Sequence, residues 1–283
     1  MPSVPLSPPP SPNMYVAVLG GEGTMPWRML EGIHAQGKKV FLIAVPDLTD
    51  PALAAASDEV LWLRYPKLRR VKRECQKRHI REFALVGRIP HSRLFTLKPW
   101  QLDLTALRLF LTLPDFRADT LLGAIADQFS RWNMELINTI RYLKPFLAKQ
   151  GVLTKKGPSP TALGDIEFGL RFAKELGRLD IGQTIVIKNR AIVAVEAMEG
   201  TDACIQRAGD IAGPGCVIIK MAKPAQDGRF DVPVIGVNTI EKCAKIEAAA
   251  LAIEGGRTLL IDKETLSRAE ELGVSVIGLP LLE

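Results

Sequence analysis

An apolar run that ends in a glycine-rich turn and leads into a helix is the strongest constraint on the fold of this chain. The run is MYVAVLG (14–20), the turn is GGEGTMP (20–26), and a helix follows over 27–37, with Pro26 in its first turn. A second apolar run, KKVFLIAV, occupies 38–45. This order of strand, turn, helix and strand predicts an α/β domain with a parallel sheet.

The same alternation returns in the second half of the chain. Gly151 and KKGPSP (155–160) interrupt the pattern and indicate a linker. After it we expect helices over 161–177, 201–209, 240–256 and 263–273, with apolar strands between them. The sequence therefore predicts two α/β domains, the first with a Rossmann-like parallel sheet. The expected boundaries are a disordered Pro/Ser tail over 1–13, domains over 14–135 and 161–283, and a linker region over 136–160.

Composition excludes several classes of protein. The 283 residues are 47% hydrophobic and carry a net charge of +6, which is typical of a globular protein with a weak preference for anionic partners. No stretch approaches 18 apolar residues, and the first residues lack a signal peptide's apolar core. The four cysteines form no CxxC pair, which suits a reduced cytoplasmic protein. The three histidines pair with no obvious nucleophile and there is no GxSxG, so a hydrolytic triad is not predicted.

Most of the positive charge lies in RYPKLRRVKRECQKRHIRE (64–82), which we interpret as an amphipathic helix. Its basic face is either an ordinary solvated surface or a patch that contacts an anionic membrane surface or ligand. Aromatic residues only flank the segment, at Tyr65 and Phe83, so no nucleic acid partner is expected.

Three segments carry residues that suit chemistry, and each also has a purely structural interpretation. The glycine turn with Gly20, Gly21 and Gly23 is either a tight turn or a cradle for a phosphate, although it is neither GxGxxG nor a Walker motif. In VAVEAMEGTDACIQRAG (193–209), Glu196 ends an apolar strand, where open α/β sheets place ligands. The alternative there is a capping loop, in which Thr201 caps the next helix.

The third segment is KMAKPAQDGRFDVPVIG (220–236), a loop of both charge signs between two apolar runs. Arg229 and Asp231 could form a salt bridge that only stabilises the loop. The mixture also suits phosphoryl chemistry, in which carboxylates hold Mg²⁺ or orient water and cations neutralise the phosphate.

These segments resemble the signature motifs of a bacterial family. GRLDIGQ (177–183), AVEAMEGTDA (194–203), KPAQDGRFDVPVIG (223–236) and LGGEGTMP (19–26) are similar to segments of the UDP-2,3-diacylglucosamine pyrophosphatases of the lipid A pathway, in the version unrelated to metallophosphoesterases. The resemblance implies two α/β domains with the substrate between them. It also implies Mg²⁺-dependent hydrolysis of UDP-2,3-diacylglucosamine to UMP and the 1-phosphate lipid, by a cytoplasmic protein peripheral to the inner membrane of a Gram-negative bacterium.

The resemblance also assigns residues. The catalytic candidates are Asp231, Asp227, Lys223 and Arg229, of which Asp227 and Asp231 are the candidate metal ligands. The substrate-binding candidates are Gly20, Gly21, Gly23, Gly87, Asp119, Gln183, Glu196, Glu199, Gly200, Thr201, Asp202 and Gln226. One departure concerns the family's Gly-Asp-Asp before the helix near 120, because this chain has Arg117 and Ala118 before Asp119.

Other functions stay open on the sequence alone. One is a nucleotide-dependent oxidoreductase that uses the glycine turn, and another is a non-catalytic protein that binds a sugar-nucleotide lipid. The two acyl chains of the implied substrate need burial, and FLTLPDF (110–116) either lines a groove for them or belongs to an ordinary core. The sequence leaves open the acyl length and whether the protein is a homo-oligomer.

Overall fold

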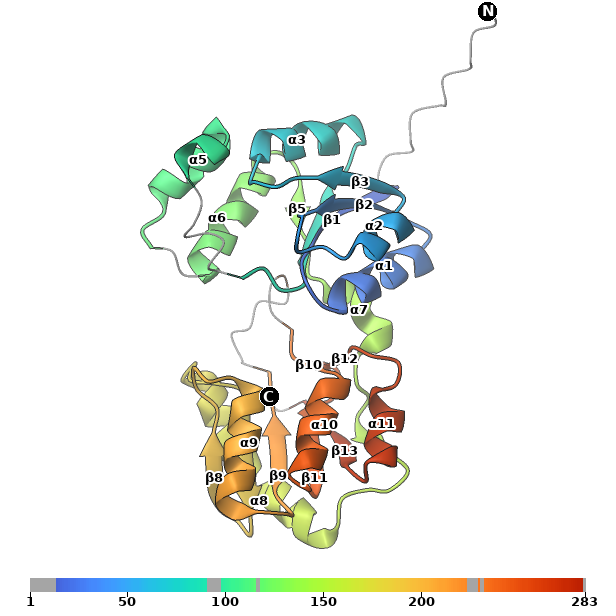
Figure 1. The fold of residues 1–283 in the computed structure, drawn as a ribbon, viewed down its shortest axis with the longest axis vertical. Coiled ribbons are helices and arrows are strands. Elements are labelled where there is room, and N and C mark those ends of the chain that lie inside the picture. Colours follow the sequence, from blue (N-terminus) through green and yellow to red (C-terminus); the bar gives the residue numbers. More distant parts are fainter. Residues whose placement is uncertain (1–13, 91–97, 116–117, 223–228, 230–231, 282–283) are drawn as a thin grey trace, which may run out of the picture. The chain divides into compact units, whose positions relative to one another are not determined.

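The computed structural model describes residues 14–90, 98–115, 118–222, 229 and 232–281, which form two compact units (Figure 1). The main boundary lies between Lys144 and Pro145, and Arg229 is grouped with the first unit. Both units are α/β, as the sequence predicts. The expected tail over 1–13 lies outside the described residues. The segment 136–160, predicted as a linker, contributes helix α7 (Ile140–Leu143) to the first unit and strand β6 (Gly151–Val152) to the second.

The first unit is built on a five-stranded sheet of order β3-β2-β1-β4-β5, in which every neighbouring pair is parallel. Buried apolar residues follow one another without alternation in the central strand, as they do where helices cover both faces of a sheet. The strands are β1 (Tyr15–Gly20), β2 (Lys39–Ala44), β3 (Glu59–Trp62), β4 (Glu82–Val86) and β5 (Glu135–Leu136). The helices are α1 (Met25–Ala35), α2 (Pro51–Ala56), α3 (Leu68–Lys77), η1 (Pro99–Gln101), α5 (Leu104–Thr112), α6 (Ala118–Ser130) and α7.

The glycine turn and the first helix lie as predicted. Strand β1 ends at Gly20, and α1 begins at Met25 with Pro26 in its first turn, where a missing backbone N–H costs nothing. Past its end, Gly37 has a φ of 72°, the left-handed conformation that ends many helices. The start and the end of α1 therefore lie where Pro26 and Gly37 predict them.

The second unit contains a six-stranded mixed sheet of order β6-β13-β11-β9-β7-β8 and a small parallel pair, β10 with β12. Strands β9, β11 and β13 are parallel, whereas β7 runs antiparallel to both β9 and β8. The strands beyond β6 are β7 (Thr184–Lys188), β8 (Ala191–Val195), β9 (Val217–Lys220), β10 (Val234–Ile235), β11 (Ala250–Glu254), β12 (Leu259–Leu260) and β13 (Ser275–Leu279). The helices are η2 (Lys144–Phe146), which spans the boundary, and α8 (Pro160–Arg178), α9 (Thr201–Ala212), α10 (Val237–Lys245) and α11 (Thr265–Glu271).

One predicted helix is wrong in its second half. The expected helix over 240–256 ends at Lys245, and β11 follows as a fully buried strand. Glu247 adopts a φ of 51° and so interrupts the helix. The alanine-rich sequence favours a helix, but burial between β9 and β13 determines the structure instead.

Alternate residues of the second sheet pack on its two faces. Val186, Ile218 and Leu251 pack with α9 and α10 on one face, whereas Ile187 and Ile219 pack with α8 on the other. This two-residue period follows from the pleat of the strands. The sheet therefore lies between two helical layers, which cover its faces. A ligand can approach it where the strands end.

All four cysteines are buried free thiols. Cys75 lies in the core of the first unit, and Cys204, Cys216 and Cys243 lie in the core of the second. Burial raises the pKa of Cys75 and Cys243 to about 12 and that of Cys204 to about 11. These residues are packing residues of the two cores.

Candidate active site

The predicted site residues of the second unit gather at one edge of its sheet. Lys220, the last residue of β9, pairs with Thr184 at the start of β7 and with Ile253 near the end of β11. Glu196 directly follows β8, the neighbour of β7. The start of β7 and the carboxyl ends of β8, β9 and β11 therefore lie along the same edge, where open α/β sheets bind ligands.

Glu196 is the centre of a small hydrogen-bonded cluster at this edge. Its side chain is buried, with 6% exposure. The Thr201 hydroxyl donates to Oε1 of Glu196 at 3.0 Å, and the backbone N–H of Gln183 donates to Oε2 at 3.3 Å. The Thr184 and Thr201 hydroxyl oxygens are 3.4 Å apart. Three of the predicted binding residues, Gln183, Glu196 and Thr201, are thus brought together.

Close packing of two backbone segments makes this cluster possible. A Cβ atom at Gly182 would lie 2.2 Å from the carbonyl oxygen of Glu196, a distance that real Cβ atoms do not reach. Only glycine at this position lets the segment before β7 approach Glu196 so closely. The motif GRLDIGQ (177–183) therefore ends in the two residues that contact the end of β8. The side-chain oxygen of Gln183 is buried and accepts no hydrogen bond from the described residues.

The residues after Glu196 build the turn into α9. Gly200 has a φ of 82° and is the N-cap residue, which explains a glycine at this position. Glu199 closes the turn by accepting hydrogen bonds from the Ala197 N–H at 3.1 Å and from Arg207 at 2.6 Å. Hydrogen bonds from its own backbone N–H and from Arg207 lower the pKa of Glu199.

Two interpretations of this turn can now be compared. Thr201 does not cap α9 through its side chain, so the capping-loop interpretation is wrong for this residue; its hydroxyl binds Glu196 instead. Asp202 accepts a hydrogen bond from Asn238 at 2.9 Å and so joins the first turns of α9 and α10. The sequence EGTD is thus a rigid support for the edge of the sheet.

Both flanks of the charged loop are fixed at the same edge. Before the loop, Met221 donates its N–H to the Gln183 carbonyl at 2.9 Å, and Ala222 donates to Oε2 of Glu254 at 3.1 Å. After the loop, Val232 is buried, and the Val234 carbonyl accepts from Nζ of Lys220 at 3.3 Å. The described residues on both sides of the loop are therefore held at the edge that carries Glu196.

Glu254 is a residue that the sequence analysis missed. It ends β11, is only 2% exposed, and lies 3.6 Å from Arg257 as well as binding the backbone of Ala222. A buried carboxylate needs such partners because an unpaired charge in the interior is costly. The sequence does place this acid at the end of an apolar run and directly before two glycines, as at the end of a strand. Glu254 was missed because the run was interpreted as part of a helix.

Most predicted catalytic residues lie outside the described residues. These are Lys223, Asp227 and Asp231, and the substrate-binding candidate Gln226 lies outside the described residues as well. Arg229 is described as a half-buried turn residue. Asp119 lies in the first turn of α6. The structure thus describes the support of the predicted site, and the assignment of catalytic roles stays a prediction.

The glycine turn of the first unit packs tightly against the end of β4. The Gly21 N–H donates to the Val86 carbonyl at 2.8 Å, and Glu22 and Arg88 exchange two backbone hydrogen bonds. A Cβ at Gly21 would lie 2.6 Å from the Arg88 oxygen, and one at Gly87, whose φ is 85°, would lie 2.7 Å from the Glu22 oxygen. This packing explains both glycines without a ligand.

Gly20 and Gly23 differ from that pair. The Gly20 carbonyl accepts from the Thr49 hydroxyl at 2.5 Å, which ties the turn to the segment after β2. Gly23 has a φ of 96° and open space around its Cβ position. If the turn binds an anion, its free surface is at Gly23 and the start of α1 rather than at Gly21.

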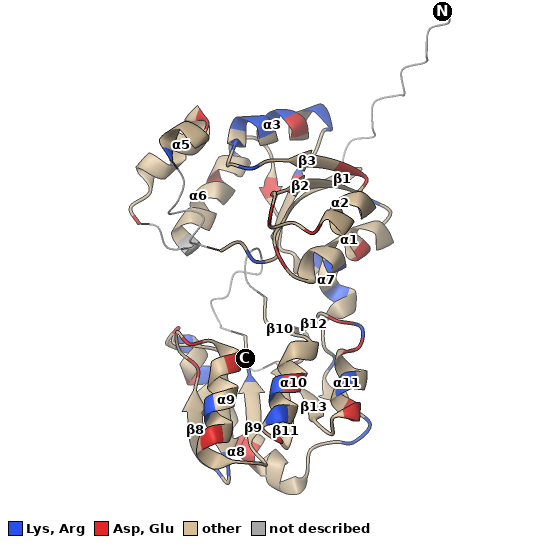
Figure 2. Cartoon of the chain, in the orientation of Figure 1, with Lys and Arg blue, Asp and Glu red and all other residues tan. Residues whose placement is uncertain are grey.

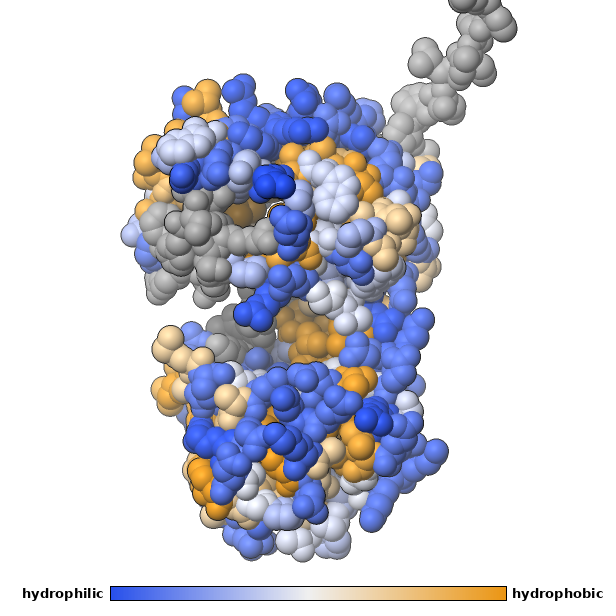
Figure 3. All heavy atoms as spheres, viewed as in Figure 1, coloured by the Kyte–Doolittle hydropathy of each residue, from blue (hydrophilic) through white to orange (hydrophobic). Residues whose placement is uncertain are grey.

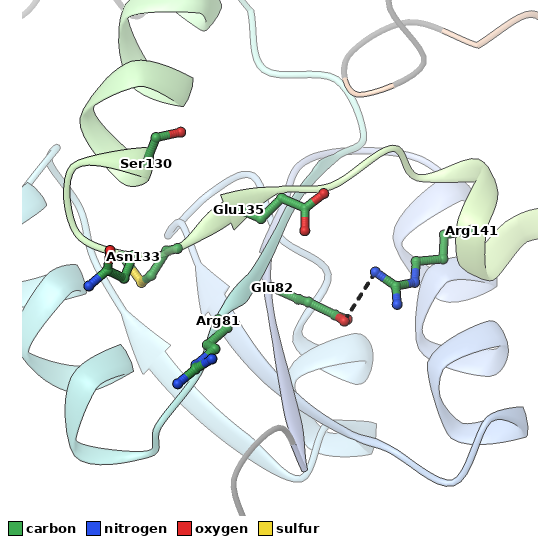
Figure 4. A pocket seen from close by; sticks show the side chains of 7 residues that line it. Arg81, Glu82, Ser130, Asn133, Glu135 and Arg141 are labelled. Atoms are coloured by element: carbon green, nitrogen blue, oxygen red, sulfur yellow. Dashed lines mark ion pairs between the residues drawn. The ribbon is translucent and has the colours of Figure 1, made fainter.

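A pocket of about 520 Å³ lies at the opposite edge of the first sheet, at the amino ends of β4 and β5 (Figure 4). Glu82 faces it but is already engaged, because it accepts hydrogen bonds from Lys38 and Tyr142 and pairs with Arg141 at 3.2 Å. The pocket also lacks the motif residues named above. We therefore do not assign it as the active site.

No three His, Cys, Asp or Glu side chains converge as a metal site within the part of the chain that the structure describes. Both carboxylate oxygens of Glu196 already accept hydrogen bonds, so this residue is a structural acceptor rather than a ready cation ligand. No helix among the described residues is long and apolar enough to span a bilayer.

Comparison with known proteins identifies two family domains that correspond to the two structural units. Residues 15–145 match the model of the LpxI N-terminal domain, and residues 149–277 match that of the LpxI C-terminal domain. The chain belongs to the LpxI family. It is similar to the UDP-2,3-diacylglucosamine pyrophosphatase LpxI of Caulobacter vibrioides, with 28% identity over 279 residues that span 93% of this chain and 96% of the relative. The two LpxI domains meet where the two structural units divide, and the resemblance inferred from the motifs is confirmed.

Proposed function

We propose that this protein hydrolyses the pyrophosphate bond of UDP-2,3-diacylglucosamine, releasing UMP and 2,3-diacylglucosamine 1-phosphate for lipid A biosynthesis. The observation that carries the proposal is the convergence of three family motifs at one sheet edge. Gln183 from the first motif binds Glu196 of the second, and the flanks of the third are fixed to the same edge. Membership of the LpxI family over both domains supports the same activity.

In this proposal the charged loop carries the chemistry. Asp231, with Asp227, orients the attacking water, and Lys223 and Arg229 stabilise the negative charge that develops on the pyrophosphate. The Glu196 cluster does not react. It holds β8, β7 and the start of α9 rigid, so that the loop acts from a fixed base.

The reaction is proposed to depend on Mg²⁺. Asp227 and Asp231 are four residues apart and supply carboxylate oxygens, which are the ligands that this hard cation prefers. When bound, the ion would neutralise phosphate charge and lower the pKa of water. We further propose that the glycine turn binds the phosphate or sugar portion of the substrate at Gly23 and the start of α1, and that Gly21 and Gly87 shape this turn by their close packing. Asp119 and EGTD (199–202) are proposed to contribute to substrate binding as well.

The substrate is a lipid, so we propose that the protein works in the cytoplasm at the surface of the inner membrane. Its two acyl chains must leave water during catalysis, because each buried methylene is worth roughly 0.8 kcal/mol. Part of the segment 110–116 is exposed: Leu111 on α5 has 77% exposure and is not a core residue.

The test is release of UMP from detergent-dispersed UDP-2,3-diacylglucosamine, with Mg²⁺ or with a chelator. We expect turnover that requires the metal and falls by a factor of hundreds or more in Asp231→Asn. Asp210→Asn is the matched control, because Asp210 is an exposed acid near the far end of α9 and should tolerate the same change.

The other outcomes are equally informative. Turnover that survives Asp231→Asn would keep the function and remove our site assignment. Tight substrate binding without turnover under any divalent metal would favour a non-catalytic binding protein. Binding of a nicotinamide or flavin cofactor, with no UMP release, would favour an oxidoreductase.

A further inference from the structure

The outer surface of the first unit combines a basic helix with exposed apolar side chains. Helix α3 buries Val71 and Cys75, and this arrangement turns its basic face to solvent. That face carries Arg69, Arg70, Arg73 and Lys77, all exposed. Figure 2 shows how much of α3 consists of lysine and arginine.

Helix α3 carries a large excess of positive charge. Its sequence contains five basic residues and one acid, Glu74. Glu74 is tied to Arg73, Lys77 and Arg78 by ion pairs of 3.0–3.3 Å. The hydrogen bond from Arg78 is the main cause that lowers the pKa of Glu74 to about 2. This acid is thus fully used by its neighbours, and the outer face of α3 stays strongly positive.

Helix α5 lies beside α3 and exposes apolar residues. The Arg69 N–H donates at 2.6 Å to Asp103, the N-cap of α5, so the starts of the two helices are joined. Leu104, Arg108 and Leu111 follow at i, i+4 and i+7 and therefore share one face of α5. That face is exposed, with 60% exposure at Leu104 and 77% at Leu111.

A tryptophan precedes this helix. Trp100 in η1 is 74% exposed, and the ammonium group of Lys98 lies 5.2 Å from its ring centroid. Figure 3 shows the apolar atoms over α5 next to the hydrophilic atoms over α3. We call the exposed side chains of Arg69, Arg70, Arg73, Lys77, Trp100, Leu104, Arg108 and Leu111 the α3/α5 face.

We propose that the α3/α5 face docks the protein onto a bilayer that contains anionic phospholipid. Exposed Leu and Trp side chains beside a cluster of Lys and Arg suit the interface between a bilayer and water. The apolar groups enter the headgroup region, and the cations remain at the lipid phosphates. An acidic partner protein would satisfy the charge alone, and nucleic acid would need aromatic residues interleaved with the basic ones.

The electrostatic attraction between the basic residues and the anionic lipid also predicts how much binding should weaken in a variant. Each Lys or Arg near an anionic membrane surface strengthens binding by about fivefold, and the effect decreases with salt. Removal of three arginines from α3 should therefore weaken binding by about a hundredfold. Loss of the two exposed leucines should weaken binding as well, but with little dependence on salt.

The experiment is cosedimentation of the full chain with phosphatidylcholine vesicles, with and without phosphatidylglycerol. Arg69→Gln/Arg70→Gln/Arg73→Gln tests the charges of the α3/α5 face, and Leu104→Ser/Leu111→Ser tests its two exposed leucines. The matched control is Arg171→Gln/Lys174→Gln/Arg178→Gln, which removes three exposed cations of α8 in the other unit. Circular dichroism verifies that each variant is folded.

We expect binding only to the vesicles that contain phosphatidylglycerol, with loss in both α3/α5 variants and wild-type binding in the α8 control. Equal binding to both vesicle types, equal loss in the control, or no binding by the wild-type chain would overturn the proposal. If the leucine variant instead loses a wild-type oligomer on gel filtration without any lipid binding, the face is a subunit interface. The assay contains no substrate, so its result is independent of the proposed hydrolysis.

Discussion

The hydroxyl of Thr201 donates a hydrogen bond of 3.0 Å to Glu196, so the first residue of α9 secures the acid that directly follows the preceding strand, β8. The two residues are separated by a turn that depends on Gly200 in a left-handed conformation. The sequence motif from Glu196 to Thr201 is therefore one local structure.

Replacing Thr201 by Val should destabilise the second unit. The change removes a donor from a buried carboxylate, which typically costs about 1–3 kcal/mol in the free energy of unfolding. We expect UMP release to fall with it, because the support of the charged loop is loosened. Urea denaturation followed by circular dichroism measures the first effect. Thr201→Ser keeps the hydroxyl and is the control; a serine variant as unstable as the valine variant would contradict the assignment of the effect to the hydroxyl alone.

Glu254 should act as a positioning residue for the charged loop. Glu254→Leu leaves the Ala222 N–H without its acceptor, whereas Glu254→Gln retains an oxygen that can accept from it. A small displacement of catalytic groups can cost about a hundredfold in rate. We therefore expect kcat for UMP release to fall at least tenfold further in the leucine variant than in the glutamine variant. Equal kcat values in the two variants would contradict this role.

Gly21→Ala should destabilise the first unit by about 1–3 kcal/mol, because the added methyl group meets the backbone of Gly87 and Arg88, which cannot move as a flexible side chain would. The matched change is Gly123→Ala in α6, where nothing lies within 4 Å of the added carbon. Alanine favours a helix over glycine by up to about 1 kcal/mol, so this control should be neutral or stabilising. Thermal unfolding compares the two, and the same loss in both variants would exclude the steric explanation.

The first unit should lose stability in acid through Glu82. Burial opposes ionisation of this side chain, but the hydrogen bonds from Tyr142 and Lys38 and the charge of Arg141 outweigh it and lower the pKa of Glu82 below its ordinary value of 4.5. A depressed pKa in the folded state contributes stability that is complete above pH 4.5 and is lost as the pH falls through the folded value. Wild-type protein should therefore be destabilised more steeply below pH 4.5 than Glu82→Gln, as measured by denaturant titration at several pH values. Parallel curves for the two proteins would count against this assignment.

The sequence predicts the alternating elements well because their signals are local. Pro26 and Gly37 mark the ends of α1, and the apolar runs at 15–20 and 39–44 can only be buried between helices. The helix expected through 250–254 failed because alanine favours a helix locally, while burial between two strands is a property of the whole sheet. Glu254 was missed for the same reason.

For the candidate site, the sequence indicated which residues take part but not what each of them does. Motif resemblance indicated Gln183, Glu196 and Thr201, and the structure brings them into contact. What each one does could not be predicted, since a threonine before a helix can cap it or bind a neighbouring strand, and only the tertiary position of Glu196 decides. The close approach that needs Gly182 and the one between Gly21 and Gly87 likewise join segments that are distant in the sequence.

The buried thiols give each unit its own reporter of opening. Thiolates rather than thiols react with alkylating reagents, and the native cores hold these groups protonated and covered. Alkylation at Cys75 must therefore wait until the first unit opens, and alkylation at Cys243 until the second does. Mass spectrometry of the labelled peptides would read the opening of the two halves separately in one untagged, unmutated sample.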